Sequence, residues 1–323
     1  MARPKSPVTE YRSYYLPMQF PVKLLSGDHW KISDIPSKRL HFHNCLEIGI
    51  CHSGSGYMEV LGETLAFHAE NVTIIPKNVP HTTCSSPGTE SHWSYLYLDP
   101  KGLFRNFLPA TWEDYDLTKF TLSGLRPVLS YGEYPHVHEL VLAVIRELEE
   151  EKPCFQVSAK GLLLSLYIEI YRIQRSDNGW GALQLEDEEP RVETENALVI
   201  APALNYIEEN YMQQFTIEYL AELCHWSPTH FRRVFHDIMG ISPLDFVNNT
   251  RISKACDLLR STEESVLNIS EMVGFHSVSS FNRYFIRINQ MTPREYRKQM
   301  QKSDKKTENQ SVLEYTGWFY PEK

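Results

Sequence analysis

Three histidines and one glutamate in the N-terminal part of the chain have the residue types and the spacing of a metal or polar-ligand site. His41, His43 and Glu47 lie close together, and His81 follows a proline-containing turn. Imidazole and carboxylate groups bind Zn, Fe, Mn or Ni ions, and the same groups can hydrogen-bond a polar molecule. We therefore expect these four residues to bind either a divalent metal or a small polar effector, and the residue types fit both.

Aromatic side chains on neighbouring β-rich runs could extend this site. Trp93, Tyr95 and Tyr97 alternate along one run, and Tyr57 lies in another. Aromatic rings stack on sugar-like ligands, although large rings are also ordinary core residues, and the sequence leaves both roles open. The residues expected to bind the effector are His41, His43, Glu47, Tyr57, His81, Trp93 and Tyr95.

A different chemistry is indicated near the C-terminus, where one segment occurs twice. Phe231 and Arg233 match Phe281 and Arg283 at an offset of 50 residues. Before the turn, Ala221 matches Ser270 at an offset of 49 residues. The second copy therefore has one extra residue in its turn, which is how a repeat changes while keeping its fold. Each copy has the pattern of a helix, a tight turn and a second helix.

The second helix of each copy has an apolar face and a polar face. Spacing at 3.6 residues per turn predicts an inward set of Phe231, Val234, Phe235 and Ile238, and of Phe281, Tyr284, Phe285 and Ile288. Arginine forks onto guanine and asparagine onto adenine in the major groove, so the outward faces suit DNA. One such face could simply be solvated, but two matching copies favour DNA contact. The residues expected to contact DNA are Thr229, His230, Arg232, Arg233, His236, Val278, Ser279, Asn282, Arg283 and Arg287.

The elements that must position these residues follow from the pattern of the chain. Short β-rich runs at residues 46–50, 56–61, 71–75 and 93–98, bounded by Gly and Pro turns, predict an all-β barrel or sandwich. Helical spacing follows at residues 140–148 and 162–171. These helices either complete the barrel core or pair between subunits, and both alternatives fit. Residues 176–196 are strongly acidic, as expected of a solvated linker.

The bulk composition restricts the class of protein. The chain has 323 residues, enough for two domains, and its 42% hydrophobic and 23% charged content is ordinary for a soluble globular protein. A net charge of −9 argues against a nucleic-acid partner, but most of it lies in the acidic stretch. We see no membrane-spanning run or signal-peptide core, and the scattered cysteines predict reduced thiols. We therefore expect a cytoplasmic protein without a membrane partner.

Residues 200–300 closely resemble the DNA-binding module of the AraC/XylS family of transcriptional regulators. The residues that carry the resemblance are Leu220, Ala221, Ser227, Arg233, Val234, Phe235, Gly240, Ile241, Ser242, Pro243, Arg251, Ile252, Ala255, Leu258, Leu259, Val273, Gly274, Phe275, Ser277, Phe281, Asn282, Arg283, Tyr284, Phe285, Thr292, Pro293, Tyr296 and Arg297. The resemblance implies two helix-turn-helix units joined by a long helix, with DNA contacts at Thr229, Arg232, Arg233, Val278, Ser279, Asn282 and Arg283.

The sequence departs from the family pattern at four positions. His236 and Ile286 stand where a lysine is common, Ser270 where alanine is usual, and Gln290 where a glycine usually ends the helix. The missing lysines and glycine predict weaker phosphate contact and a less sharp helix stop. We therefore expect the first copy to dominate sequence recognition.

The order of the N-terminal histidines is similar to the two cupin motifs over about residues 38–100. The matching residues are His41, His43, Glu47, Gly54, Pro76 and His81, with Asn78 in place of a glycine. In front of an AraC-type module, this resemblance implies an effector-sensing domain.

The predicted architecture is a two-domain α+β protein. It comprises an irregular N-terminal arm (1–20), a cupin-like effector-binding barrel (21–110), a helical extension suited to dimerisation (111–175), the acidic linker (176–196), an all-α DNA-binding domain with two helix-turn-helix units (197–301) and a tail (302–323). We expect a regulator and not an enzyme, with double-stranded promoter DNA, a small effector, RNA polymerase and a second copy as partners, and no required cofactor. The alternatives are a metal-dependent cupin enzyme and a regulator that needs no effector.

Overall fold

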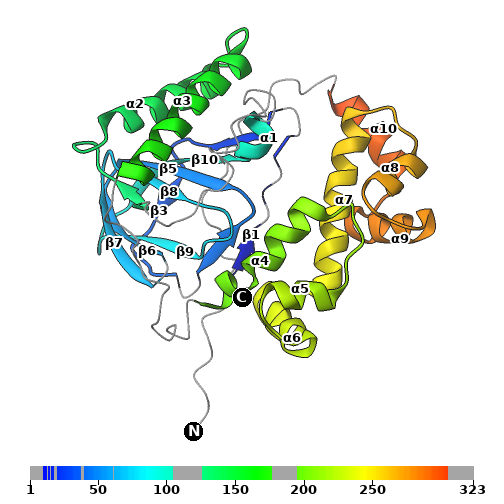
Figure 1. The fold of residues 1–323 in the computed structure, drawn as a ribbon. Helices are drawn as coiled ribbons and strands as arrows, with labels where there is room; N and C mark the ends of the chain where they lie inside the picture. The colour runs from blue at the N-terminus through cyan, green and yellow to red at the C-terminus, as the bar shows by residue number, and fades with distance from the viewer. Residues whose placement is uncertain are drawn as a thin grey trace. The chain divides into compact units, whose positions relative to one another are not determined.

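The computed structural model describes residues 10–12, 14, 16, 17, 20–37, 40–60, 62–104, 126–176 and 195–304. The chain divides into an N-terminal domain, which is rich in β-strands, and a C-terminal domain over Asn196–Asn309, which is helical (Figure 1). The two-domain α+β prediction is confirmed. The acidic linker at 177–194 and the tail at 305–323 lie outside the described residues.

Two sheets form the cupin-like barrel of the N-terminal domain. One has the strand order β1-β4-β9-β6-β7, and the other has β11-β8-β5-β10-β2, with β3 pairing to β10. The strands are β1 (Glu10–Arg12), β2 (Val22–Leu25), β3 (Lys31–Ile32), β4 (His41–His43), β5 (Leu46–Ser53), β6 (Ser55–Val60), β7 (Glu63–His68), β8 (Val72–Ile75), β9 (His81–Ser85), β10 (Ser91–Leu98) and β11 (Val128–Leu129).

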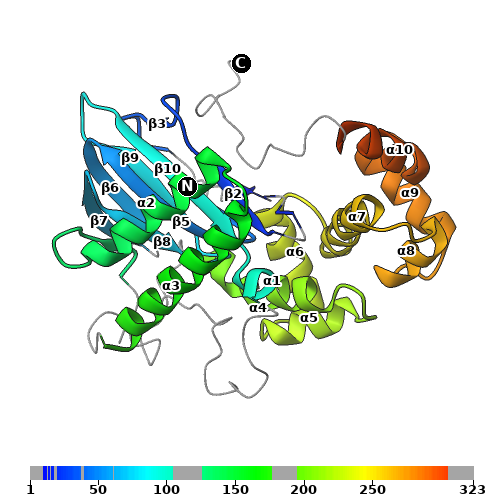
Figure 2. The same ribbon diagram turned by 90° about the horizontal axis from the view of Figure 1, so that it is seen from above.

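Helices cover the outer face of the second sheet. The short α1 (Pro100–Phe104) is followed by α2 (Pro135–Glu150) and α3 (Phe155–Ser176), which lie side by side over β5 and β10 (Figure 2). Ile48 and Leu96 from the sheet pack in one core with Val141 and Leu166 from the helices. Each such buried aliphatic side chain contributes roughly 1.5–3 kcal/mol to folding. Of the two sequence alternatives, completion of the barrel core is therefore the one seen, and pairing between subunits stays a prediction.

Two segments differ from the predicted domain pattern. Residues 1–20 were expected to be irregular, but Glu10–Arg12 form β1 and pair in parallel with His41–His43. This pairing satisfies backbone groups along β4 that would otherwise form a sheet edge. In the expected helical extension, Val128 and Leu129 instead form β11 and pair with β8. The barrel therefore takes strands from both flanking segments.

The C-terminal domain contains seven helices in its described residues: α4 (Glu195–Asn210), α5 (Ile217–Leu223), α6 (Pro228–Met239), α7 (Pro243–Ser261), α8 (Val266–Met272), α9 (Val278–Asn289) and α10 (Pro293–Asp304). We call α5 with α6 the first unit, and α8 with α9 the second unit. The long α7 joins them. The domain limits extend slightly beyond the predicted 197–301 because α4 begins at Glu195 and α10 ends at Asp304.

Side-chain caps fix the starts of the helices in both units. Ser227 accepts a hydrogen bond from the backbone N–H of His230, with Pro228 next to it. Ser277 caps α9 in the same way by accepting from the N–H of Ser280. An oxygen at this position satisfies one of the free N–H groups of the first turn. The turn holds four residues in the first unit and five in the second, so the extra residue predicted from the offset lies in the turn.

The inward faces of α6 and α9 match the predicted periodicity except at one position. Phe231, Phe235, Phe281 and Phe285 are fully buried, but Ile288 is 40% exposed. Phe285 packs against Tyr296 of α10, with ring centroids 5.5 Å apart. These aromatic rings complete that face of the core and leave Ile288 outside it. Among the described residues, no helix is long and apolar enough to cross a membrane.

Candidate functional site

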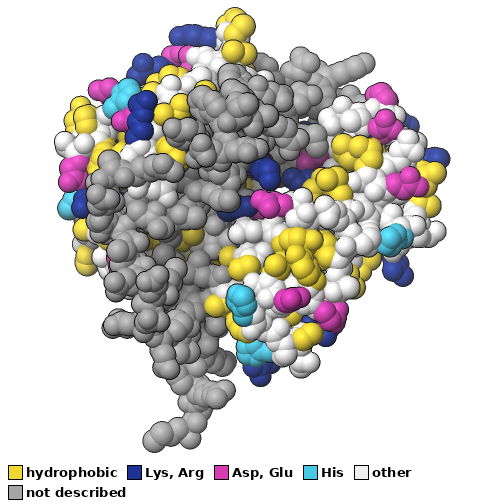
Figure 3. Space-filling model, in the orientation of Figure 1, with side chains coloured by type: hydrophobic (Ala, Val, Ile, Leu, Met, Phe, Trp, Pro, Cys, Tyr) yellow, Lys and Arg dark blue, Asp and Glu magenta, His cyan; other side chains and the backbone are white. Residues whose placement is uncertain are grey.

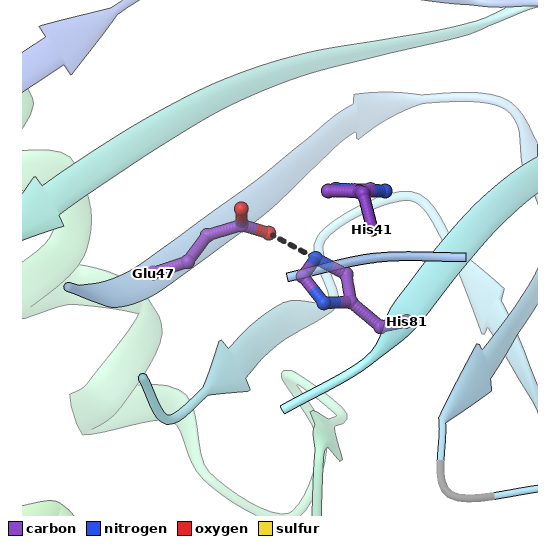
Figure 4. Close-up of side chains that lie close together, drawn as sticks. All are labelled: His41, Glu47 and His81. Atoms are coloured by element: carbon purple, nitrogen blue, oxygen red, sulfur yellow. Dashed lines mark ion pairs between the residues drawn. The ribbon is translucent and has the colours of Figure 1, made fainter. Parts of the chain in front are cut away.

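The structure brings the four predicted ligand residues together between the two sheets. His41 and His43 come from β4 and His81 from β9, and Glu47 faces them from β5 of the opposite sheet (Figure 4). The Oε2 atom of Glu47 lies 3.1 Å from Nε2 of His43, and its Oε1 lies 3.5 Å from Nε2 of His81. All four side chains are buried. One ligand atom from each of His41, Glu47 and His81 falls within 4.8 Å of the other two.

The turn before β9 places His81 opposite β4. Asn78, at the position where the cupin motif has glycine, has a φ of 62°, in the left-handed region that glycine and asparagine tolerate best. Its backbone N–H donates to the carbonyl of His43 at 2.8 Å. The departure from the motif therefore keeps the turn geometry that positions His81.

The hydrogen bonds of two histidines fix which nitrogen faces Glu47. Nδ1 of His43 lies 2.9 Å from the carbonyl oxygen of Cys45, and Nδ1 of His81 lies 2.9 Å from that of Val79. A carbonyl oxygen only accepts, so each Nδ1 carries a proton. Nε2 of His43 and of His81 is buried and faces the Glu47 carboxylate. Imidazoles that ligate a metal are commonly oriented by such a bond from the other nitrogen.

The electrostatics of the cluster favour a cation at its centre. Burial by itself would raise the pKa of Glu47, but the imidazoles of His81 and His43 outweigh it and hold the pKa well below its usual range. Burial also lowers the pKa of His43, and it lowers the pKa of His41 further, with the neighbouring His81 adding to that effect. The Glu47 carboxylate and the Nε2 atoms of His43 and His81 face one another, so a positive charge between them is favourable. Either a proton or a divalent metal supplies it.

Tyr14 from the N-terminal segment adds a side chain to the site that was not predicted from the sequence. Its ring stacks on Tyr97 at 3.9 Å and meets His43 edge-on at 6.0 Å. Asn44 holds the Tyr14 backbone through its side-chain oxygen and nitrogen, at 2.9 and 3.1 Å. Burial raises the pKa of Tyr14 to about 12, so its hydroxyl stays protonated. No local pattern links residue 14 to residue 97, so this contact could not be found from the sequence.

The expected aromatic residues fall in two different places. Tyr95 lies on the same face of β10 as Tyr97, which lies 5.6 Å from the His43 ring. Trp93 is on that face too, in the same buried cluster as Tyr95 and Tyr97, and donates its indole N–H to Ser91. Tyr57 pairs with Cys84, whereas Val60 pairs with His81. The two pairs are an odd number of positions apart along the strands, so their side chains point to opposite faces of the sheet. Tyr57 therefore lies on the opposite face of the sheet from the histidines, and the expectation that it joins the effector site is wrong.

The outward face of α6 presents four of the five DNA-contact residues predicted on this helix. Thr229, Arg232, Arg233 and His236 are exposed. Arg232 pairs with Glu218 of α5 at 2.9 Å, and Arg233 lies 3.1 Å from Nδ1 of His230. His230 is half-buried because its ring packs on Trp226. The basic face of the first unit is therefore held in place by neighbours within that unit.

The matching face of α9 is less basic. Ser279 and Arg283 are exposed, whereas Val278 and Asn282 are half-buried. Arg287 pairs with Asp245 of α7 at 2.9 Å and lies over the ring of Tyr284 at 4.4 Å. Arg287 thus contacts the connecting helix as well as the surface predicted to meet DNA.

The predicted loss of a sharp stop at the end of α9 is wrong. Gln290 takes the left-handed conformation, with φ 56°, and its N–H donates to the carbonyl of Ile286 at 2.9 Å. Gly240 ends α6 with φ 69° and the equivalent bond to His236. The Gln290 side chain also donates to the carbonyl of Arg287 at 2.8 Å, which helps to hold this conformation.

The surface of the helical domain mixes charges of both signs. On the face seen in Figure 3, basic side chains alternate with acidic and apolar ones and form no continuous patch.

Two family models match this chain. A helix-turn-helix domain matches residues 220–299, which include both units. An AraC-like ligand binding domain matches residues 34–167, which include the histidine and glutamate cluster and α2. The two regions found from the sequence are thus the two regions that the family models recognise.

Individual relatives agree with these matches. An uncharacterized HTH-type transcriptional regulator, YobQ of Bacillus subtilis, is 34% identical over 104 residues, or 32% of this chain and 43% of the relative. Another from Haemophilus influenzae is 31% identical over 179 residues, or 52% of this chain and 57% of the relative. The chain thus spans about half the length of these curated relatives. The solved C-terminal domain of the response regulator yesN from Fusobacterium nucleatum is 36% identical, with a TM-score of 0.28, and covers 29% of this chain and 93% of that one.

Proposed function

Since the chain belongs to the AraC type of helix-turn-helix proteins, we propose that it is a transcriptional regulator whose barrel senses a ligand and whose paired units bind promoter DNA. The observation that carries the proposal is the repeated outward arginine. Arg233 and Arg283 occupy the same position on α6 and α9, and both are exposed. Folding alone does not require a repeated exposed arginine, whereas guanine recognition in two successive grooves does.

The sensing role rests on the cluster in the barrel. Ligand atoms of His41, Glu47 and His81 lie within 4.8 Å of one another and suit a divalent transition-metal ion. His43, whose Nε2 lies 3.1 Å from the Glu47 carboxylate, stands beside them as a further ligand. We propose that His41, His43, Glu47 and His81 bind such an ion, either as the signal itself or as the anchor of a small polar effector. Tyr14 and Tyr97 pack against the His43 ring beside this cluster. Ligand binding that differs between two arrangements of the protein would change how the units engage DNA.

Gel retardation with DNA from upstream of the gene tests the DNA-binding part. We expect specific retardation by the wild-type protein and none by the Arg233→Ala, Arg283→Ala double variant. The absence of specific retardation for the wild type, with or without metal, would contradict the proposal. Dimerisation stays a prediction, which the molecular mass of the protein–DNA complex in solution can check. Contact with RNA polymerase also stays a prediction, which transcription in a purified system can check.

Metal binding is tested on the full-length protein by equilibrium dialysis against Zn²⁺, Mn²⁺, Ni²⁺ and Fe²⁺. We expect one ion per chain for the wild type and loss of binding for Glu47→Gln and His81→Ala. His68→Ala is the matched control because His68 is exposed on β7. Metal should also raise the melting temperatures of the wild type and of His68→Ala. It should leave the melting temperatures of Glu47→Gln and His81→Ala unchanged. Equal binding by all four proteins would exclude this cluster. If sugars or other polar metabolites raise the melting temperature while a chelator removes metal ions, the site binds an effector without a metal.

A further inference from the structure

The loop at residues 211–214 leads directly into the first unit, but its side chains contact the second unit. It joins α4 to α5, and α4 packs on α5 through Tyr206 and Tyr219, whose ring centroids are 4.9 Å apart. Yet the side chain of Gln214 donates to the carbonyl of Gly274, in the turn of the second unit, at 3.0 Å. Tyr211 packs against the apolar core of the second unit. The loop therefore bridges the two units.

Arg251 of α7 holds the same loop. Its Nε donates to the carbonyl of Tyr211 at 2.8 Å, and its Nη2 donates to the carbonyl of Gln213 at 2.9 Å. The guanidinium also lies 5.8 Å from the ring centroid of Phe275 in the second unit. Arg251 is 8% exposed. A buried guanidinium is costly unless its N–H groups are satisfied, so its position depends on these carbonyls staying in place.

The turn of the second unit is shaped to receive the loop. Gly274 has a φ of +90°, and a Cβ placed there would lie 2.8 Å from the carbonyl oxygens of both Tyr211 and Met212. At the matching position in the first unit stands His225, which has a φ of 56° and is exposed. Both turns need the left-handed conformation, but only the second needs the absence of a side chain. The close approach is thus specific to the second unit.

We propose that the loop at 211–214 is a second attachment between the two units, and that Arg251 and Gln214 are positioning residues that fix the orientation of α9 relative to α6. The connecting helix α7 provides the other attachment. A single attachment leaves the units free to turn about it, whereas two separate attachments do not. Two tethered readers gain affinity only when both can engage one duplex together. The inference rests on the proposed DNA-binding function.

Hydroxyl-radical footprinting of the full-length protein on its operator tests this role. Gln214→Ala removes the bond to Gly274, and Gln213→Ala is the matched control because only the backbone of Gln213 contacts Arg251. Arg251→Lys keeps the charge but cannot bond both carbonyls in the same geometry. We expect Gln214→Ala and Arg251→Lys to weaken DNA binding by about tenfold or more, as the tethering gain is lost. Protection at the α9 contact should disappear first, while protection at the α6 contact remains.

The outcomes separate positioning from general damage. Equal loss of protection at both contacts, or unchanged protection at both, would overturn the proposal. If Arg251→Lys unfolds, comparing the footprints of Gln214→Ala and Gln213→Ala still tests the proposal. The Gln214 side chain is exposed, so its truncation leaves the cores intact. A wild-type protein that protects no DNA would instead contradict the proposed function, and this inference with it.

Discussion

The two helix-turn-helix units have nearly the same backbone but differ in what surrounds them. In both, a serine caps the second helix, two phenylalanines fill the core, and a left-handed residue ends the helix. In the first unit, the turn faces solvent and the outward face has two adjacent arginines. In the second, the turn receives the loop at 211–214, and Arg287 pairs with α7. The duplicated sequence has thus kept its fold while one copy is more exposed and the other more tightly held by its neighbours.

The largest expected effect separates the two turns. Gly274→Ala should lower the free energy of unfolding of the C-terminal domain by about 2–4 kcal/mol, because the new Cβ adds backbone strain and meets two carbonyls. His225→Ala at the matching position should change it by less than about 1 kcal/mol, because that turn is open. Urea unfolding of both variants measures the difference. Similar losses for the two would show that the loop does not press on Gly274.

The next effect concerns recognition. Arg233→Ala and Arg283→Ala should each weaken binding to the operator by about 1–3 kcal/mol and relax specificity at one base position. We expect the loss to be larger for Arg233, because the face of α6 has the adjacent Arg232 and His236, where α9 has Asn282 and Ile286. Competition binding against single-base operator variants measures both losses. Unchanged binding for both variants would remove the base-contact assignment.

A smaller effect is expected where the helices end. Gln290→Gly should raise the free energy of unfolding by about 0.5–1 kcal/mol, because glycine adopts the left-handed conformation without the cost that glutamine bears. Gly240→Ala should lower it by about 1 kcal/mol at the matching position. A loss of stability in Gln290→Gly would mean that the side-chain bond to Arg287 outweighs the backbone cost.

The smallest effect is expected from the exposed ion pair between Asp245 and Arg287. Asp245→Asn should cost no more than about 1 kcal/mol of stability, since both side chains are partly solvated. DNA binding should be unchanged or tighter, because Arg287 is then released toward phosphate. Glu218→Gln, which releases Arg232 in the first unit, is the parallel variant. Weaker binding by Asp245→Asn would show that the pair itself orients α9.

The sequence predicted features that depend on local pattern. The spacing of Phe281 and Phe285 marked an inward face, and the length difference between the copies marked the turn. Contacts between distant segments left no such signal. Tyr14 contacts Tyr97 because β1 pairs with β4. Gly274 approaches the carbonyl oxygen of Tyr211 although the two residues lie far apart in the sequence.

The candidate site was predicted in part for the same reason. The cupin-like order brought His41, His43, Glu47 and His81 into one proposal, and the structure places them together. Tyr57 was misplaced because a shift of one strand position exchanges the two faces of a sheet, and register cannot be read from alternation alone. Ile288 was misplaced because Tyr296, from another helix, packs on Phe285 and completes that core.

Selection of binding sites from a random DNA library by the full-length protein tests whether the two units read DNA unequally. We expect two enriched elements about one helical turn, or roughly 10 base pairs, apart, with the element contacted by α6 better defined than the element contacted by α9. Arg233→Ala should blur the first element, and Arg283→Ala the second. Absence of any enriched sequence would contradict the assignment as a DNA-binding regulator, and two equally defined elements would contradict the division of roles between the units.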